Sequence, residues 1–206
     1  MSRNAAALRS AAAVLPLLGL AACGSPSVAD PTVGSAAATA ASAAAMTLTS
    51  TDVQQGATIA RVHVYTADGC GGGNVSPTLS WSGAPAATRS FALTIHDPDA
   101  PHAGGFWHWV VFDLPAGTTG LPRGAGSAGS SGMPAAARQG RNDFGDSTYD
   151  GPCPPVGNAP HHYNFTLSAL DVATLNLPAG SAAAQVDFAV RAHTLAAARL
   201  TGLYGR

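Results

Sequence analysis

The 206-residue sequence contains no lysine and no glutamate, so its side-chain charges come from 10 arginines and 11 aspartates. Charged residues make up only 10% of the chain, well below the usual share of about a quarter. Without lysine there is no covalent chemistry through a lysine amine, and without glutamate there is no glutamate pair for acid and base catalysis. The formal net charge is −1. Because no basic patch is available to neutralise a run of phosphates, nucleic acid is not expected as a partner.

The N-terminus has the pattern of a targeting segment. Arg3 and Arg9 precede a short apolar stretch, residues 14–20, which is too brief to span a bilayer. The sequence Leu-Ala-Ala-Cys that ends at Cys23 resembles the lipobox of bacterial lipoproteins. Cleavage before Cys23 would remove residues 1–22 as a lipoprotein signal peptide. An ordinary secretory signal with a chance cysteine is the alternative. We expect a lipid on Cys23 that anchors the protein to a bacterial membrane, facing the periplasm or the cell exterior.

Residues 23–45 are almost entirely alanine, serine, threonine, glycine and proline. This composition cannot form a core and predicts a flexible tether. The folded domain is expected over residues 46–206, a common size for one domain. After removal of the signal peptide, 8 arginines face 11 aspartates. Electrostatic attraction to the membrane is therefore not expected to add to the lipid anchor.

The apolar pattern of the domain is mainly that of β-strands. The run from Trp107 to Phe112 is apolar on both faces, which predicts a central strand between two layers. Helical spacing is seen only from Val190 to Tyr204. Short runs bounded by Gly, Pro and Asp predict further strands at Ile59–Tyr65, Phe91–Ile95, Trp107–Leu114 and Tyr163–Leu170. The predicted fold is mainly β: an antiparallel β-sandwich of two sheets with a short C-terminal helix.

Two parts of the sequence together suggest a small polar site in an apolar wall. Asp97-Pro-Asp99-Ala-Pro101 is a stiff turn that presents two carboxylates, and His108 follows in the apolar strand. Gly151-Pro-Cys153 is a second rigid loop, with His161 and Tyr163 at the start of the next strand. Each piece alone also has a structural explanation, as a turn or as a hydrogen-bonded core histidine. Two further clusters, around Asn74 and around Arg141, are explained by turns between strands.

The order of the motifs resembles that of the phosphatidylethanolamine-binding protein family. These motifs are Asn-x-Ser-Pro-x-Leu-x-Trp from Asn74, Asp-Pro-Asp-Ala-Pro from Asp97, Trp-His-Trp-Val-Val from Trp107, Gly-Pro-Cys-Pro-Pro from Gly151, and His-x-Tyr-x-Phe from His161. The match covers residues 46–206 and is most similar to the bacterial Raf kinase inhibitor-like branch. The segment between Pro101 and Phe106 is short, so kinase-binding surfaces are not carried over. His162 stands where many members have arginine.

The resemblance implies a pocket that binds small anions and phosphorylated head groups, with no cofactor. Matched motif by motif, the implied pocket residues are Asp97, Asp99, Pro101, His108, Gly151, Cys153, His161 and Tyr163. The leading hypothesis is therefore a membrane-tethered binding protein rather than an enzyme. A module that modulates a protein partner, as some relatives do, is a further hypothesis.

Two enzyme hypotheses compete with it. Cys153 with His108 and His161 could form a thiol hydrolase, and the two histidines with Asp97 could bind zinc for hydrolysis. Against the thiol enzyme, Cys153 lies between prolines, and Cys70 offers a disulfide partner outside the cytoplasm. We therefore expect a disulfide between Cys70 and Cys153.

An anion requires donors, so the carboxylates are expected to support the site from behind. In this hypothesis Asp97 and Asp99 accept hydrogen bonds and raise the pKa values of the histidines. His108 and His161, at least partly protonated, then donate to the phosphate, and Tyr163 adds its hydroxyl.

Overall fold

The computed structural model describes residues 45–206. The predicted signal peptide, the predicted lipidation site Cys23 and the predicted tether up to residue 44 lie outside this range. Within the described range, no helix has the length and apolar character needed to cross a membrane.

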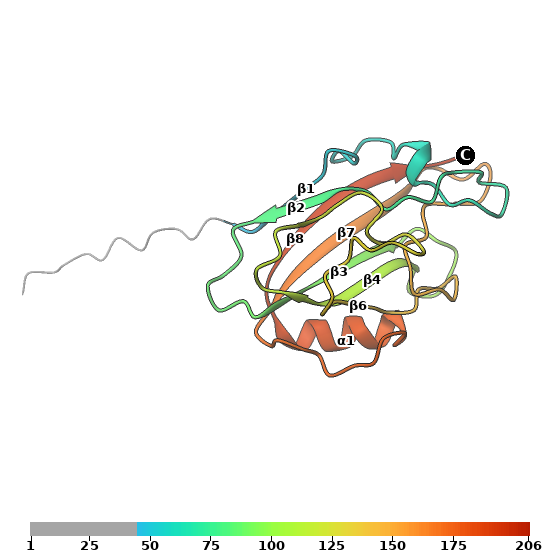
Figure 1. Ribbon diagram of the computed structural model, residues 1–206. Helices are drawn as coiled ribbons and strands as arrows, with labels where there is room; N and C mark the ends of the chain where they lie inside the picture. The colour runs from blue at the N-terminus through green and yellow to red at the C-terminus, as the bar shows by residue number, and fades with distance from the viewer. Residues whose placement is uncertain (1–44) are drawn as a thin grey trace, which may run out of the picture. The chain divides into compact units, whose positions relative to one another are not determined.

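The described chain forms two antiparallel sheets (Figure 1). The smaller sheet has the order β1-β2-β5, with β1 at Thr47–Thr49, β2 at Leu79–Ser82 and β5 at Gly120–Leu121. The larger sheet has the order β6-β4-β3-β7-β8. Its strands are β3 at Ser90–Asp97, β4 at Phe106–Pro115, β6 at Arg138–Gln139, β7 at His161–Leu170 and β8 at Thr194–Tyr204. The prediction of an antiparallel β-sandwich is confirmed.

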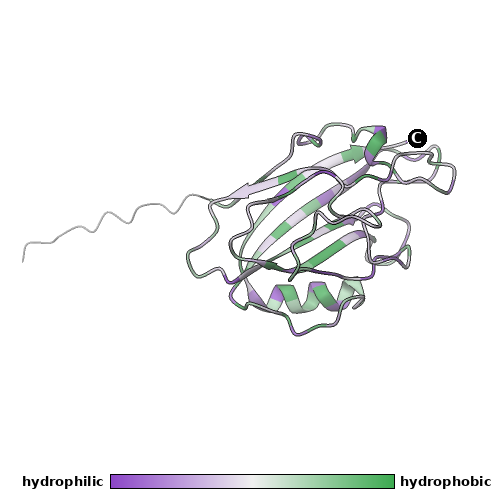
Figure 2. Ribbon diagram, viewed as in Figure 1, coloured by the Kyte–Doolittle hydropathy of each residue, from purple (hydrophilic) through white to green (hydrophobic). Residues whose placement is uncertain are grey.

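Strand β4 separates two apolar layers. Trp109 and Val111 belong to the main core, which lies between the two sheets. Val110 and Phe112 point to the other face and pack with the helix α1, Ala183–His193. Figure 2 shows the hydrophobic residues recurring along these strands and along α1. The prediction that this stretch forms a central strand between two layers is confirmed.

The single helix that the sequence analysis expected is present, but the expected range was wrong. Residues 183–193 form α1, which buries Ala183, Val186 and Val190 at helical spacing. The following residues form β8, which pairs with β7 along almost its whole length. Burial in β8 alternates, with Ala198 and Leu200 inside, so the leucines that suggested a helix belong to a strand.

The prediction of a strand at Ile59–Tyr65 was also wrong. This stretch contains a short 3-10 helix, Arg61–His63, and irregular backbone. Its backbone groups bond to several separate partners: Ile59 N donates to Leu203 O at 2.7 Å, and Tyr65 N donates to Pro152 O at 3.1 Å. The first contact fixes the segment to β8, and the second fixes it to the loop that follows Gly151, which forms part of the site.

Candidate ligand-binding pocket

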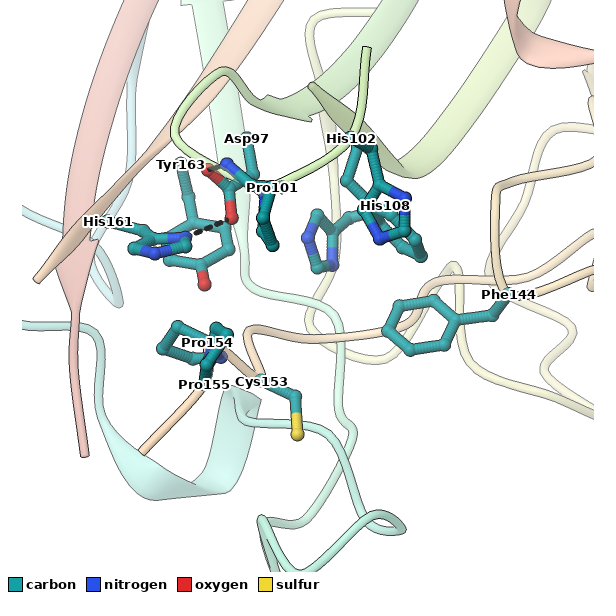
Figure 3. A pocket seen from close by; sticks show the side chains of 12 residues that line it. Asp97, Pro101, His102, His108, Phe144, Cys153, Pro154, Pro155, His161 and Tyr163 are labelled. Atoms are coloured by element: carbon teal, nitrogen blue, oxygen red, sulfur yellow. Dashed lines mark hydrogen bonds and ion pairs between the residues drawn. The ribbon is translucent and has the colours of Figure 1, made fainter. Parts of the chain in front are cut away.

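A pocket of about 160 Å³ lies at one end of the larger sheet, where β3 ends and β4 and β7 begin. Because neighbouring strands are antiparallel, the end of β3 and the starts of β4 and β7 lie at the same end of the sheet. The polar side chains of the pocket are Asp97, His102, His108, His161 and Tyr163 (Figure 3). Its apolar wall consists of Ala100, Pro101, Phe106, Phe144, Cys153, Pro154 and Pro155.

A β-bulge places His108 in this pocket. Ile95 of β3 pairs with Trp109, whereas the next residue, His96, pairs with Trp107, so His108 is the extra residue in β4. Simple alternation would put His108 and Trp109 on opposite faces of the sheet. The bulge changes this: Trp109 packs in the main core, and the His108 ring lies 5.1 Å from the ring of Tyr163, which belongs to the same core.

Asp97 orients His161. Oδ2 of Asp97 accepts a hydrogen bond from Nδ1 of His161 at 2.8 Å, and both side chains are buried (Figure 3). The other carboxylate oxygen accepts from the backbone N–H groups of Asp99 and Ala100, at 2.8 and 3.1 Å. Asp97 thus closes its own turn and at the same time fixes one ring of the pocket. Nε2 of His161 lies 3.3 Å from the side-chain nitrogen of Asn158.

His108 is held as a neutral ring with one free nitrogen. Its Nδ1 donates to the backbone oxygens of Asp150, at 2.9 Å, and Gly151, at 3.1 Å. Carbonyl oxygens only accept, so Nδ1 carries the proton. Burial lowers the pKa of His108 to about 4, although the two carbonyls and the charge of Asp97 act in the opposite direction. Nε2 therefore presents a lone pair. Asp97 does raise the pKa of this histidine, as expected, but desolvation is the larger effect, so the net shift does not favour the expected protonated ring.

Tyr163 has an unpaired hydroxyl. The residue is fully buried, and among the described residues its hydroxyl has no hydrogen-bond partner. Burial raises the pKa of the phenol, and so do the charge of Asp97 and an interaction with its carboxylate that does not reach ordinary hydrogen-bond geometry, so the phenol remains a donor. A buried hydroxyl without a partner is costly, and this one belongs to a side chain that lines the pocket.

A polar network behind His108 was not expected from the sequence. Asp150 is buried, and its carboxylate accepts from Asn74 at 2.9 Å and from Asn142 at 2.7 Å. Oδ1 of Asn74 in turn accepts from the backbone N–H of Gly151 at 2.8 Å. The network fixes the two carbonyls to which His108 donates. Desolvation raises the pKa of Asp150, whereas the two asparagines oppose that shift.

Asn74 and Asn142 lie in the two clusters that the sequence analysis explained as turns. Their polar side chains inside long motifs were the available signal. No periodicity connects these positions, which lie 68 residues apart in the chain.

Cys153 is bonded to Cys70, and their Cα atoms are 5.7 Å apart. This bond ties the loop of the pocket to the segment that contains Cys70, across 83 residues of sequence. Gly151 is needed in the same loop because a Cβ atom there would collide with the backbone of His63. In this bonded form Cys153 contributes to the pocket wall and carries no thiol.

Two of the expected pocket residues do not line the pocket. Asp99 lies outside it and pairs with His162, whose Nδ1 lies 2.7 Å from Oδ2 of Asp99 on the exposed surface. Although desolvation acts in the opposite direction, the hydrogen bonds from His162 lower the pKa of Asp99. Gly151 acts through its carbonyl on His108. The other expected residues do line it: Asp97, Pro101, His108, Cys153, His161 and Tyr163.

The aromatic wall was not expected from the sequence. Phe106 and Phe144 have ring centroids 4.8 Å apart, and Phe144 stacks on Tyr65 at 4.3 Å. Phe106 also lies 5.4 Å from the ring of His102, a residue to which the sequence analysis gave no role. Phe106 follows two glycines at the start of β4, and Phe144 comes from the cluster around Arg141. Only the fold brings the two rings together.

Within residues 45–206, no group of three or more His, Cys, Asp or Glu side chains is arranged to hold a metal ion. The Asp97 carboxylate is already engaged by His161 and by two backbone N–H groups. The geometry therefore gives no support to the zinc hypothesis.

A small pocket at the end of a two-sheet β-sandwich is typical of a binding module, and comparison with known proteins identifies the family. The model of the phosphatidylethanolamine-binding protein family matches residues 49–205. The chain belongs to this family, as its motifs indicated.

Several bacterial relatives support the assignment. The chain is 44% identical to protein YbcL of Escherichia coli over 164 residues, which cover 80% of this chain and 90% of YbcL. The crystal structure of YbcL, described as a new member of the mammalian family, matches with a TM-score of 0.77 at 42% identity and covers 79% of this chain and 99% of that one. A Mycobacterium tuberculosis relative named "Putative lipoprotein LppC" is 41% identical over 136 residues, covering 66% of this chain and 62% of the relative.

Proposed function

We propose that this protein binds a small phosphorylated ligand in the pocket between Asp97, His108, His161 and Tyr163. The observation that carries the proposal is the buried hydroxyl of Tyr163, which lacks a partner within the described chain. A phosphate oxygen would accept its hydrogen bond and remove the cost of leaving it unpaired. Pocket size supports the same class of ligand, because a cavity of about 160 Å³ is small for a ligand site and suits a small ligand.

We further propose that the domain works on a lipid tether attached at Cys23, outside the cytoplasm. The lipobox-like sequence supports this, and so does the name of the mycobacterial relative. A disulfide between Cys70 and Cys153 is also typical of an oxidising compartment.

The test is a titration with inorganic phosphate and phosphoethanolamine, followed by NMR of the backbone amides and by calorimetry. Binding should shift the signals of His108, His161 and Tyr163 and leave those of α1 unchanged. Tyr163→Phe should weaken binding about tenfold, the usual effect of losing one hydrogen bond to a charged group. The absence of any shift at millimolar ligand would rule the proposal out.

A further inference from the structure

The pocket has an unusual charge balance for a phosphate site. Among the described residues that line it, none is arginine, and the chain contains no lysine. The nearest formal charge is negative: the buried carboxylate of Asp97 lines the pocket directly. A phosphate dianion would enter this site without a permanent positive charge to balance it, which is costly in a buried environment.

The hydrogen-bonding groups of the pocket also disfavour a fully deprotonated phosphate. Nδ1 of His108 donates to the carbonyls of Asp150 and Gly151, so its free Nε2 can only accept while the ring is neutral. The ring centroid of Tyr163 lies 5.1 Å from that of His108, and the buried hydroxyl of Tyr163, a donor, has no hydrogen bond of ordinary geometry within the described chain. A ligand that satisfies both groups must offer one donor and one acceptor side by side.

We propose that the pocket selects a phosphate group that carries one proton, as free phosphate or as a monoester. The P–O–H group donates to Nε2 of His108, and an unprotonated phosphate oxygen accepts from the hydroxyl of Tyr163. This inference rests on the proposed function and narrows it. Phosphate diesters, which include the head groups of intact phosphatidylethanolamine, have no P–O–H group and are disfavoured. Sulfate has the same shape but carries no proton near neutral pH, so it is disfavoured too.

The neutral state of His108 has a structural basis. Its ring is buried among Phe106, Phe144 and Tyr163, which supply no charge. The charged or titratable side chains that face it are Asp97, which favours the protonated ring, and His96, which opposes it. Desolvation outweighs the favourable contributions. His102 and His161 also line the pocket, so a pH profile alone would not assign an effect to His108.

The experiment measures affinity for a matched series by calorimetry on the purified protein at about pH 6, near the second pKa of a phosphate monoester. Methyl phosphate and dimethyl phosphate differ by one methyl group and by the P–O–H donor, and sulfate serves as the proton-free tetrahedral anion. Methyl phosphate should bind about tenfold or more tightly than either of the others, because each of them leaves Nε2 of His108 unpaired. Equal affinities for all three would overturn the inference while leaving anion binding intact. No binding of any of them would refute the proposed function itself.

The source of the proton is tested with a second ligand. Methylphosphonate has a higher second pKa than methyl phosphate, so the fall in its affinity should occur at correspondingly higher pH. If both ligands lose affinity at the same pH, a protein group controls binding and the inference is wrong. The phosphorus NMR signal of the bound ligand gives a direct readout. It should keep the chemical shift of the monoanion at about pH 8, above the value at which the free ester ionises, and a shift typical of the dianion would contradict the inference.

His108→Asn is the matching variant, since its side-chain amide can still donate to the two carbonyls but has no atom at the Nε2 position. It should lose about tenfold in affinity for methyl phosphate and none for sulfate. If this variant does not fold, the ligand series on the unaltered protein still decides.

Competition by vesicles that contain phosphatidic acid, a lipid monoester, distinguishes a lipid ligand from a free phosphate or a soluble monoester. Displacement of methyl phosphate by these vesicles, but not by phosphatidylethanolamine vesicles, supports a lipid ligand. Displacement by phosphatidylethanolamine vesicles alone would overturn the inference.

Discussion

Asp97 and His161 form a buried pair across 64 residues of sequence, with Oδ2 and Nδ1 at 2.8 Å. Two residues further along the turn, Asp99 meets His162 at 2.7 Å in the same chemical arrangement, but both side chains are exposed. The two pairs therefore allow the effect of burial and of pocket position to be compared within one loop.

Asp97→Asn should weaken both folding and binding. The amide cannot accept from His161 and from the two backbone N–H groups as the carboxylate does, so we expect a loss of about 1–3 kcal/mol in the free energy of unfolding. Affinity for phosphate should fall about tenfold, because His161 is no longer oriented. Asp99→Asn is the control, and it should change stability by less than about 0.5 kcal/mol and leave affinity unchanged. Urea unfolding and calorimetry measure both. Equal effects of the two substitutions would show that the buried pair has no special role.

Tyr163→Phe should separate stability from binding. It removes a buried hydroxyl that has no partner within the described chain, so the free energy of unfolding should be unchanged or rise by about 1 kcal/mol. Tyr149→Phe is the matched control, since the hydroxyl of Tyr149 donates to the carbonyl of His63 at 2.6 Å. That variant should lose about 1–2 kcal/mol, because the buried carbonyl is left unpaired. Thermal and urea unfolding test the difference, and a destabilised Tyr163→Phe would mean that the hydroxyl already has a partner in solution.

The depressed pKa of His108 predicts that the protein is less stable in acid. The ring titrates at about 4 in the folded state and at 6.5 in its ordinary state, so the unfolded chain takes up the proton first as the pH falls. The neutral His108 ring contributes its full stability above pH 6.5. This contribution is lost progressively between pH 6.5 and about 4, and the total loss is about 3 kcal/mol. Asp150, with a raised pKa, opposes this trend at the acid end. Urea unfolding at several pH values should show a slope that is largely absent in His108→Asn. The same slope in both proteins would assign it to other groups.

The motifs predicted most of the pocket because its residues lie on stiff turns and at strand ends, where local sequence determines the backbone. The position of His108 could not be predicted in the same way. In Trp107-His108-Trp109, alternation places the histidine on the face opposite both tryptophans, and only the bulge opposite Ile95 and His96 brings it beside Tyr163. The neutral state of its ring also escaped prediction, because desolvation depends on packing by Phe106 and Phe144 from distant segments.

Contacts between distant segments also explain why the helix range predicted from the sequence was wrong. Leucines at 195, 200 and 203 in an alanine-rich stretch fit helical spacing, and alanine favours a helix. In the fold, the edge of β7 needs a partner, and β8 satisfies its hydrogen bonds from His161 to Leu170. Tertiary pairing therefore overrides the local preference.

Lipid attachment at Cys23 can be tested without reference to the described domain. The unaltered protein should be found in the membrane fraction, and Cys23→Ala should move it to the soluble fraction. Mass spectrometry of the N-terminal peptide should show a diacylglycerol thioether on Cys23. Cys70→Ser is the control, since it also removes a cysteine but lies within the domain and should leave the protein in the membrane fraction. A soluble, unlipidated protein before any substitution would refute the anchor.

The disulfide should stabilise the fold and hold the pocket loop in place. Because it joins residues 83 positions apart, reduction should lower the free energy of unfolding by about 4.5 kcal/mol in the chain-entropy model. Reduction should also weaken phosphate binding, since Gly151, whose carbonyl accepts from His108, is two residues before Cys153.

The test uses a Cys23→Ala background, so that the two remaining cysteines are the only source of thiols. Alkylation without reductant should modify neither cysteine, and intact mass should rise by two hydrogens on reduction. A Cys70→Ser, Cys153→Ser double variant should reproduce the loss of stability without reductant. Two alkylatable thiols in the untreated protein would contradict the prediction and return Cys153, beside His108 and His161, to consideration as a nucleophile.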